Sequence, residues 1–560
     1  ALSSAASDVY KRQVISGSVI ISSFAALTFT PMLATKLLVK REKQNWFYLK
    51  TEPFFEGMNR LYSRSLAVFL HKRWIALPFV AITIGIIAFL WNYIPAEMAP
   101  LEDRSQISIN TRGAEGVTYE YIRDYTEDIN DLVDSIVPDA ESVTARVSSG
   151  SGNVRITLKD MKDRDYTQMD VAEKLSAAVQ KKTMARSFVQ QSSSFGGRRG
   201  GMPVQYVLQA TNIKKLQEVL PKFMAKVYEN SVFQMADVDL KFSKPEARIN
   251  INRDKASIMG VSTRNIAQTL QYGLSGQRMG YFYMNGKQYE ILGEINRQQR
   301  NTPANLKSIY IRSDKGDMVQ LDNLIELTGG IAPPKLYRYN RFVSATVSAG
   351  LAEGKTIGQG LDEMDKIAKE TLDDTFRTAL TGDSKEYRES SSSLMFAFIL
   401  AIVLIYLILA AQFESFKDPL IIMLTVPLAI AGALVFMYFG GITMNIFSQI
   451  GIIMLIGLVA KNGILIVEFA NLKQETGEDK MTAIKDAALQ RLRPILMTSA
   501  STILGLIPLA FASGEGCNQR IAMGTAVVGG MLVSTLLTMY IVPAIYSYIS
   551  TNRSNKLKQE

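Results

Sequence analysis

Lys461 is a charged side chain in the middle of the apolar stretch GLVAKNGILIVEFA, residues 457–470. An ionisable residue inside a membrane span costs about 2.5–3.5 kcal/mol on insertion scales, so it is a candidate functional residue. Arg491 and Thr498 follow in the next apolar region, seven residues apart, which places them near one face of a helix. Together with a carboxylate, a lysine, an arginine and a hydroxyl group of this kind can form a proton relay.

Lys461 lacks an evident carboxylate partner. Glu468 is the nearest acid, but it lies about 10 Å further along the helix axis, too far for a direct ion pair. The other apolar segments contain no Asp or Glu, so we expect the partner to lie outside this chain. Two alternatives stay open. In one, Lys461 lines a water-filled cavity or a subunit contact and takes no part in proton coupling. In the other, the Thr498 hydroxyl bonds only to its own helix backbone.

Lys461, Arg491 and Thr498 can form such a relay only if they lie on helices that cross a membrane. A bilayer core takes about 20 helical residues, and the apolar segments that reach or approach this length are 14–38, 74–95, 394–411, 419–439, 446–470, 494–512 and 521–549. The overall composition, 47% hydrophobic and 20% charged, hides this segregation because the region between the second and third segments is polar. The sequence therefore predicts an α-helical multi-spanning membrane domain plus a soluble α+β domain.

The Lys and Arg residues that give the net charge of +10 are distributed along the chain as in a membrane protein, so we expect no nucleic-acid partner. The connection 39–73 is rich in Lys and Arg, and the positive-inside rule places it in the cytoplasm, together with the tail 551–560. The region 96–388 then lies outside. Aromatic and charged residues alternate in the connection, as in an amphipathic helix on the membrane surface; a plain connector is the alternative.

The chain offers little for catalysis. Residues 1–13, ALSSAASDVYKRQ, lack an initiator Met and resemble a translated adapter, so we exclude them from fold reasoning as an artefact. The only cysteine, Cys517, has no partner for an internal disulfide, and the only histidine, His71, sits at a span boundary. We find no nucleophile–base pairing, metal-ligand spacing or phosphate-binding loop, and therefore expect no enzyme, no cofactor and no metal.

The outside region is predicted to contain two tandem β-α-β-β units, the pattern of split β-α-β subdomains. The first lies within residues 96–194. The second lies within 195–261 and 336–388, after the Gly-rich linker FGGRRGGMP. Residues 262–335 are rich in Gly, Tyr, Gln and Asn and predict an inserted lobe.

Three stretches resemble the last spans of resistance–nodulation–division (RND) multidrug efflux transporters of the hydrophobe/amphiphile branch. They are GLVAKNGILIVEFAN (457–471), RLRPILMTSASTILGLIPLAFASG (491–514) and IAMGTAVVGGM (521–531). The resemblance covers essentially residues 14–550 and implies the C-terminal half of a twelve-span proton/drug antiporter. It assigns 14–38 to span six, 74–95 to span seven and 391–550 to spans eight to twelve, with two porter subdomains and a docking insertion outside.

The resemblance also implies roles for the candidate relay. In this family a span-ten lysine pairs with two adjacent aspartates of span four, and an arginine and a threonine of span eleven join the relay. Lys461, Arg491 and Thr498 match these positions. The aspartate pair would lie upstream of this chain. The unpaired lysine and the resemblance therefore both indicate that the carboxylate partner of Lys461 lies outside it.

Partners and location follow from the resemblance as expectations. Family members are homotrimers in the inner membrane of Gram-negative bacteria, with a large periplasmic domain. They work with a periplasmic adaptor (membrane fusion) protein and an outer-membrane channel protein. The proton gradient, and no cofactor, drives export of small amphiphilic substrates such as drugs, detergents and dyes from the lipid bilayer and its surroundings.

The expected substrate site lies between porter subdomains, partly under a flexible loop. The stretch SSGSGN (148–153) matches the place of that loop, which makes Ser149 and Asn153 candidate substrate-binding residues. Arg146 and Arg155 lie on the flanking strands, where well-known multidrug members carry aromatic residues. This difference favours polar or anionic amphiphiles.

Two other functions stay open. A metal-exporting relative is one alternative, but the periplasmic methionines form no evident thioether cluster, and the chain has one His and one Cys. A non-transporting membrane scaffold is the other, although an embedded Lys461 is costly to keep in a scaffold.

Overall fold

The computed structural model describes residues 2–37, 46–191, 202–333, 335–352 and 354–551. The expected linker at 195–203, the start of the 39–73 connection and nearly all of the tail 551–560 lie outside the described residues. The chain divides into two compact units, Ala1–Ala76 with Leu465–Met497 and Met539–Glu560, and Leu77–Ile464 with Thr498–Thr538.

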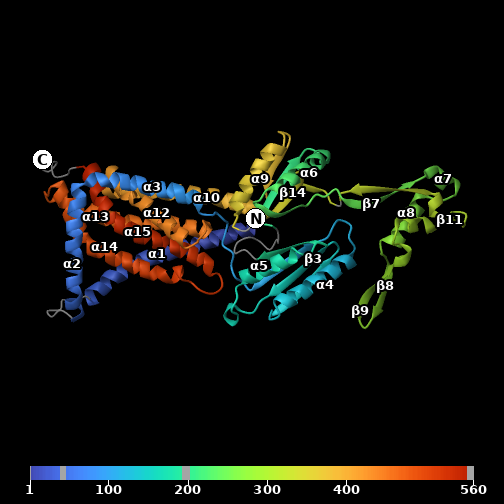
Figure 1. Ribbon diagram of the computed structural model, residues 1–560, viewed down its shortest axis with the longest axis horizontal. Helices are drawn as coiled ribbons and strands as arrows, with labels where there is room; N and C mark the ends of the chain where they lie inside the picture. Colours follow the sequence, from blue (N-terminus) through green and yellow to red (C-terminus); the bar gives the residue numbers. More distant parts are fainter. Residues whose placement is uncertain (1, 38–45, 192–201, 334, 353, 552–560) are drawn as a thin grey trace. The chain divides into compact units, whose positions relative to one another are not determined.

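Seven helical segments of the described chain are long and apolar enough to cross a membrane, and each overlaps one of the segments expected from the sequence. They are Ser16–Lys36, Arg73–Tyr93, Gly382–Phe413, Lys417–Phe439, Ile446–Glu475, Lys480–Ala510 and Cys517–Ile549. The helices that carry them are α1 (Leu2–Leu37), α3 (Ala76–Tyr93), α10 (Gly382–Phe413), α11 (Lys417–Met423), α12 (Thr425–Phe439), α13 (Ile446–Glu475), α14 (Lys480–Ala510) and α15 (Cys517–Ile549). Figure 1 labels all of them except the short α11.

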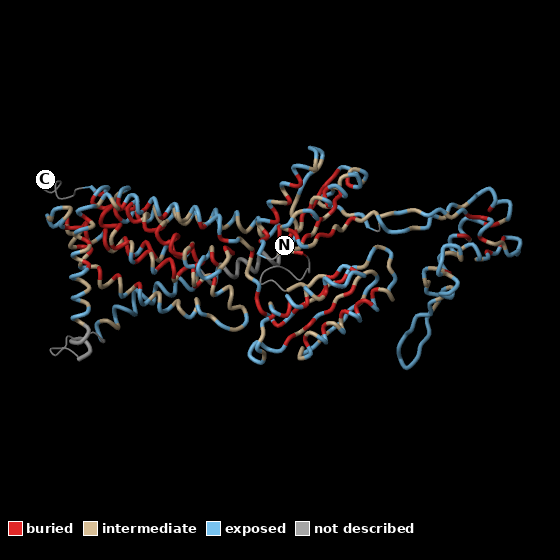
Figure 2. The backbone as a smooth tube through the Cα atoms, viewed as in Figure 1, coloured by how far each residue is buried: buried red, intermediate tan, exposed pale blue. Residues whose placement is uncertain are grey.

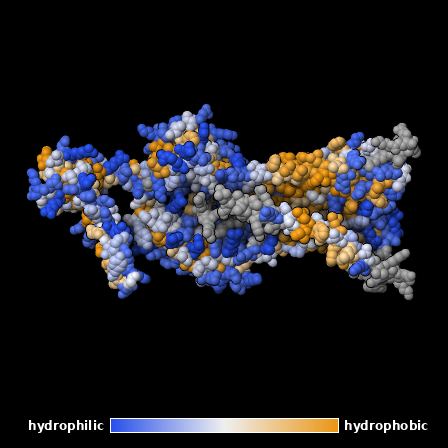
Figure 3. All heavy atoms as spheres, turned by 180° about the vertical axis from the view of Figure 1, so that it is seen from behind, coloured by the Kyte–Doolittle hydropathy of each residue, from blue (hydrophilic) through white to orange (hydrophobic). Residues whose placement is uncertain are grey.

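These helices differ in how much of their surface is covered. The apolar windows of α12 and α15 are about two-thirds buried, whereas those of α1 and α10 are almost entirely exposed (Figure 2). Exposed apolar side chains gather over the helical part of the surface, while hydrophilic ones cover the rest (Figure 3). Apolar side chains that face outward over a whole helix length are expected where lipid or further helices replace water.

Glycines let α12 and α15 approach closely within the second unit. A Cβ atom added at Gly529 would clash with the Phe436 ring, and one added at Gly432 would lie 3.1 Å from the Gly529 carbonyl oxygen. Small residues at such contacts allow tight van der Waals packing between membrane helices. This close packing fixes α15 against α12 and leaves room for a polar cluster further along α15.

The first α/β subdomain follows α3. Its elements are β1 (Gln106–Arg112), α4 (Tyr119–Ile136), β2 (Ser142–Ser148), β3 (Ser151–Thr157), α5 (Gln168–Val179) and β4 (Arg186–Gln191). The four strands form an antiparallel sheet in the order β2-β3-β1-β4. Residues from alternate strand positions and from both helices form one core, so the helices cover a single face of the sheet.

The second subdomain has the same style of packing. Its elements are β5 (Val204–Ala210), α6 (Ile213–Glu229), β6 (Phe233–Val238), β13 (Tyr337–Tyr339), β14 (Phe342–Leu351), α9 (Ile357–Thr371) and β15 (Arg377–Leu380). The strand order is β13-β14-β5-β15, and β6 also pairs with β14. Helices α6 and α9 pack on this sheet around Phe223, Leu361 and Met364.

The inserted lobe begins earlier than the expected boundary at residue 262. β7 (Lys244–Ile251) pairs along its whole length with β12 (Ile325–Ala332), and not with the second subdomain. The alternating pattern predicted the strand correctly, but alternation carries no information about the partner strand. The lobe's other elements are α7 (Arg253–Ile258), α8 (Thr263–Leu274), β8 (Gln277–Met284), β9 (Lys287–Gly293), β10 (Tyr310–Arg312) and β11 (Met318–Gln320).

Helix α2 (Trp46–His71) occupies most of the connection between α1 and α3. Within the first unit, the Tyr62 hydroxyl donates a hydrogen bond of 2.6 Å to the Met539 carbonyl. The Arg493 guanidinium pairs with Glu52 at 3.2 Å and lies 4.6 Å from the centre of the Phe55 ring. These contacts attach α2 to α14 and α15.

Candidate functional site

Lys461 projects from the uncovered side of α13. Its neighbours Ala460 and Asn462 are buried, whereas Lys461 is exposed, as are Met454 and Gly457 on the same helix face. No described residue forms an ion pair or hydrogen bond with its ammonium group. An apolar helix face with one unpaired cation in its middle is suited to receive a carboxylate from outside the described residues.

A buried polar cluster adjoins Lys461 in the chain. The Asn462 side-chain amide donates to the Ser499 hydroxyl at 3.3 Å and to the Thr535 hydroxyl at 3.4 Å, and the two hydroxyls are 3.2 Å apart. All three residues are at most 4% exposed. The cluster therefore joins α13, α14 and α15 by hydrogen bonds between side chains, which fixes the rotation of α13 about its axis.

The hydrogen bond between Asn462 and Ser499 joins the residues that directly follow two of the predicted relay residues, Lys461 and Thr498, in the chain. Thr498 is half-buried, and its carbonyl oxygen accepts a hydrogen bond of 2.8 Å from the Thr502 hydroxyl. No hydrogen bond joins Lys461 to Thr498 among the described residues.

Arg491 belongs to the other compact unit. Its guanidinium carbon lies 4.5 Å from the centre of the Phe469 ring, which is a cation–π contact. Its Nε atom is buried and meets no acceptor within the described part of the chain. A buried guanidinium with an unused donor retains the capacity to bind a carboxylate or a water molecule.

The cluster of Asn462, Ser499 and Thr535 was not predicted from the sequence. Its signal was present, because Asn462 and Ser499 directly follow Lys461 and Thr498 in apolar segments. Polar side chains in a span need partners, and two consecutive polar positions on each helix indicate one outward and one inward group. The third member, Thr535, gives no distinguishing sequence signal.

We expect Asn462→Ala to destabilise the helix bundle by about 1–2 kcal/mol. The change removes two hydrogen bonds, which contribute about 0.6 kcal/mol each between membrane helices, and it also leaves a small cavity. Detergent-solubilised protein should then unfold at a lower temperature than Ser501→Ala, which changes an exposed position on α14. Equal unfolding temperatures for the two variants would rule out a structural role for the cluster.

The predicted substrate residues share the open face of the first sheet. Arg146 lies opposite Asn153, and Arg155 lies opposite Thr144, so these side chains project to the face that α4 and α5 leave free. Both arginines are exposed, and neither forms an ion pair with a described residue. Arg146 and Arg155 are diagonal neighbours, about 7–8 Å apart at the backbone, which is within reach of a shared anion.

An amide ladder crosses the same face. The Asn153 amide donates to the Asn110 side-chain oxygen at 2.8 Å, and the Asn110 amide donates to the Gln190 side-chain oxygen at 2.9 Å. Asn153 is therefore occupied by a structural hydrogen bond in the strand. It remains next to Arg146, but it does not belong to a loop.

The expected flexible loop at 148–153 is instead a tight hairpin. Ser148 pairs with Ser151, which leaves only Ser149 and Gly150 in the turn. Gly150 has φ +81°, a conformation that glycine adopts without strain in two-residue hairpins. The sequence placed the loop correctly, but these residues continue the strands because a Ser-Gly turn allows pairing up to its ends. Ser149 is exposed at the tip of the hairpin.

A buried carboxylate joins the first sheet to the second subdomain. Asp237 in β6 lies 3.2 Å from Arg112, 3.5 Å from Arg186 and 3.1 Å from Lys241. Burial raises the pKa of the neighbouring Asp239 carboxyl above its ordinary value, and the charge of Asp237 adds to the rise. Arg112 and Arg186 lie on the same face as Arg146 and share the single Asp237 carboxylate with Lys241, whereas Arg146 and Arg155 form no ion pair with a described residue.

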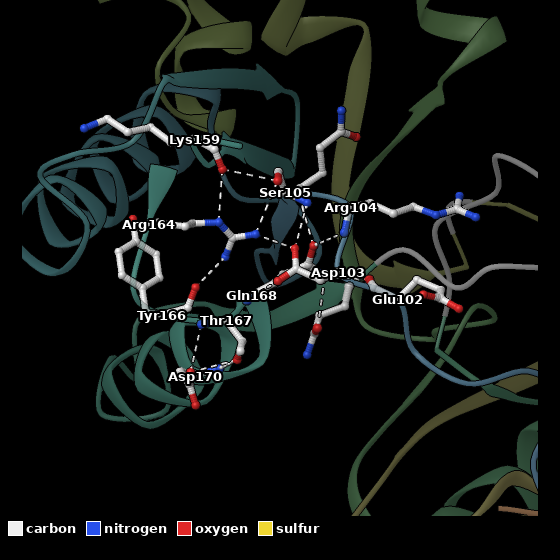
Figure 4. Close-up of polar contacts among 12 residues, drawn as sticks. Glu102, Asp103, Arg104, Ser105, Lys159, Arg164, Tyr166, Thr167, Gln168 and Asp170 are labelled. Atoms are coloured by element: carbon white, nitrogen blue, oxygen red, sulfur yellow. Dashed lines mark hydrogen bonds and ion pairs between the residues drawn. The ribbon is translucent and has the colours of Figure 1, made fainter. Parts of the chain in front are cut away.

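A second buried ion pair holds the start of the first subdomain (Figure 4). The Arg164 guanidinium donates to Asp103 at 2.5 Å and to the carbonyl oxygens of Lys159 and Tyr166 at 3.0 Å and 2.9 Å. The other Asp103 oxygen accepts the backbone N–H of Gln168 at 2.8 Å. The side chain of Arg164 is fully buried and that of Asp103 is 9% exposed. A buried pair is tolerated when the remaining hydrogen-bonding groups are also satisfied, as they are here.

Glu102, next to this pair, contacts a membrane helix. Its carboxylate accepts the backbone N–H groups of Asn518 at 3.4 Å and Gln519 at 2.9 Å, in the first turn of α15. Negative charge at a helix N-terminus is stabilising because the first N–H groups lack partners within the helix. The segment before β1 is therefore attached to α15 through Glu102 and to the start of α5 in the first subdomain through Asp103.

A bundle of apolar helices that carries a lysine and a buried polar cluster, joined to a large α/β part, defines a multi-pass membrane protein of the transporter class. Residues 12–550 match the AcrB/AcrD/AcrF family, and the chain belongs to this family of RND permeases. It is 30% identical over 549 residues to a protein of Haemophilus influenzae named "Uncharacterized transporter". The match covers 96% of this chain and 53% of that relative, so the chain spans about half the relative's length. The predicted RND membership is confirmed.

Metal ligands do not gather in the described structure: no three His, Cys, Asp or Glu side chains there are arranged to hold an ion.

Proposed function

We propose that this chain is the C-terminal half of a proton-driven efflux transporter of the hydrophobe/amphiphile branch, which exports amphiphilic compounds from the inner membrane of a Gram-negative bacterium. The observation that carries the proposal is the position of Lys461, exposed and unpaired among the described residues, in the middle of an apolar helix face. The buried cluster at Asn462 holds that face in a fixed orientation.

The relay works by forming and breaking one ion pair. A carboxylate outside the described residues pairs with Lys461 when that carboxylate is ionised, and the Thr498 hydroxyl is its proposed hydrogen-bond donor. Protonation removes the negative charge, so Lys461 loses its partner and moves. Arg491 is the third residue of the proposed relay, and its buried Nε meets no acceptor within the described part of the chain. Because the Asn462 cluster joins α13 to α14 and α15, a movement of α13 shifts these helices together.

The coupling to the outside part runs through Glu102. This carboxylate caps the first turn of α15, while Asp103 beside it is bound to Arg164 and Gln168 at the start of α5 in the first subdomain. A shift of α15 is thereby transmitted to the first porter subdomain. The transporter acts as a homotrimer with its porter domain in the periplasm, and passes substrate to an outer-membrane channel protein through a periplasmic adaptor protein.

Dye efflux from cells tests the energy source. Cells that express the complete transporter with its adaptor and channel should extrude a preloaded fluorescent dye, and a protonophore should stop extrusion at once. Extrusion that continues after the proton gradient has collapsed, while ATP is unchanged, would contradict proton antiport.

We expect the Arg146→Gln/Arg155→Gln variant to lose preference for anionic substrates. Hydrogen bonds to charged groups contribute about 1.5–3 kcal/mol each, so apparent affinity for an anionic dye should fall on the order of tenfold or more, whereas a cationic dye should be unaffected. Competitive transport by the complete protein measures this change. The matched control is Lys214→Gln/Lys222→Gln, which removes two exposed cations from α6. Equal losses for both dyes would exclude the arginines as an anion site.

A further inference from the structure

Two arginines stand directly opposite each other at one end of the first sheet. Arg112, the last residue of β1, is in register with Arg186, the first residue of β4. Opposite residues on neighbouring antiparallel strands have Cβ atoms about 4.5–5.5 Å apart, and like charges at such positions repel each other. The two arginines therefore need an anion between them. Their side chains are 56% and 60% exposed, so an anion in solution can reach them.

The anion that they contact belongs to the second subdomain. Asp237 in β6 lies 3.2 Å from Arg112 and 3.5 Å from Arg186, and the Arg186 guanidinium also donates to the Tyr228 hydroxyl of α6 at 3.3 Å. Among the described residues, the apolar core of each subdomain contains side chains of that subdomain only. Polar contacts centred on Asp237 therefore join the two subdomains at this boundary.

Asp237 keeps a partner of its own if the arginines leave. Lys241, four residues further along the chain, lies 3.1 Å from the Asp237 carboxylate and is 22% exposed. Both residues belong to the second subdomain, so a movement of the first subdomain does not separate them. Loss of the only partner of a buried charge is costly because it leaves that charge uncompensated. Lys241 avoids this cost, so the boundary is able to open.

The arginines have hydrogen-bonding capacity to spare. A guanidinium group carries five N–H donors, yet Arg112 and Arg186 each use only the Nη1 nitrogen within the described part of the chain. The next acid along β6, Asp239, accepts the Thr346 backbone N–H at 2.7 Å and forms no ion pair with a described residue. One carboxylate therefore serves three cations here, and an incoming anion meets unused donors.

We propose that Asp237 is the resident counter-anion of an exchange site, in which the headgroup of an anionic amphiphile replaces Asp237 at Arg112 and Arg186 and so opens the boundary between the two subdomains. Sulfonate, carboxylate and phosphate oxygens accept the paired N–H groups of arginine in the same way as Asp237 does. The headgroup reaches the site along the sheet face that carries Arg146 and Arg155. The inference rests on the proposed function for the class of substrate, but not on proton coupling.

Distances between two spin labels test the opening. The complete protein is placed in nanodiscs with Cys517→Ser and with labels at Lys174→Cys on α5 and Glu218→Cys on α6, which are exposed positions of the two subdomains. Taurocholate should increase the population in which the labels are further apart. The nonionic bis-gluconamidopropyl cholamide, which has the same steroid body, should not. No change with taurocholate, or an equal change with the nonionic compound, overturns the proposal.

Two double variants test the role of the arginines. Arg112→Gln/Arg186→Gln should show the larger label distance without any ligand, and taurocholate should add no further change. The matched control is Arg146→Gln/Arg155→Gln, which removes two arginines from the same face that do not contact Asp237. It should keep the shorter distance until taurocholate is added at saturation. Equal distances in the two ligand-free variants would overturn the proposal.

Taurocholate binding to Asp237→Asn tests the competition. The variant lacks the resident anion, so it should bind radiolabelled taurocholate in nanodiscs on the order of tenfold more tightly than the native protein. Equal or weaker binding would contradict an exchange between Asp237 and the headgroup. If this variant does not fold, the arginine variants still decide the matter. None of these measurements uses a proton gradient, so failure here leaves proton-driven export standing, and loss of proton coupling leaves this inference standing.

Discussion

Lys461→Ala is expected to abolish proton-coupled export while the protein still reaches the membrane in normal amounts. Lys461 is exposed, and its removal breaks no ion pair or hydrogen bond with a described residue. It does remove the cation that faces the expected carboxylate at this level of α13. Dye efflux from cells should fall to the level of cells without the transporter, a loss much larger than any change in protein abundance.

Two further variants make the expectation for Lys461 specific. Lys461→Arg keeps a positive charge but binds a carboxylate in a planar, two-pronged geometry that differs from that of an ammonium group, so it should support little efflux. Lys473→Ala removes a lysine from the same helix, one that is already paired with Glu478 at 2.6 Å. It should transport at nearly the normal rate. If Lys473→Ala were as inactive as Lys461→Ala, the loss would reflect damage to α13 and not a relay.

Arg164→Ala is expected to destabilise the first α/β subdomain by about 3–5 kcal/mol. The substitution leaves the buried Asp103 carboxylate without its cation, and breaking one partner of a buried ion pair costs this much. Local opening would then become about two to four orders of magnitude more frequent, because each factor of ten corresponds to about 1.4 kcal/mol. Hydrogen exchange of peptides from β1 and β3 in the intact protein should accelerate by that factor, whereas peptides from the second subdomain should not change.

The control for this experiment is an exposed ion pair in the same subdomain. Arg123 lies 2.6 Å from Asp124 on α4, and both side chains are about half exposed or more. Surface pairs contribute about 0–1 kcal/mol, so Arg123→Ala should leave the exchange rates nearly unchanged. Similar acceleration in both variants would mean that burial of the Asp103–Arg164 pair has no special effect.

The sequence was most informative where composition alone decides the structure. Long apolar segments predict membrane spans because a helix must be long and apolar to cross the bilayer core. Lys461 is noticeable because a charge inside a span has a high free-energy cost. Alternating residues gave most of the strands. The sequence was least informative about which strands pair with each other. The pairing of β7 with β12, which moves the start of the inserted lobe to Lys244, depends on contacts between residues far apart in the chain.

The site shows the same division between local and distant information. Arg146 and Arg155 could be assigned to one sheet face because strand alternation is local. The tight Ser149–Gly150 turn required knowledge of the pairing on both sides, and the sequence suggested a loop there. The cluster of Asn462, Ser499 and Thr535 unites three helices, and no single segment contains enough information to predict it.

The most direct test of the account is proton movement during transport. The complete transporter is reconstituted into liposomes that contain a pH-sensitive dye, and substrate is added under an imposed proton gradient. The account predicts substrate-dependent proton flux in the native protein and none in Lys461→Ala. Substrate transport without proton flux, or unchanged proton flux in Lys461→Ala, would contradict it.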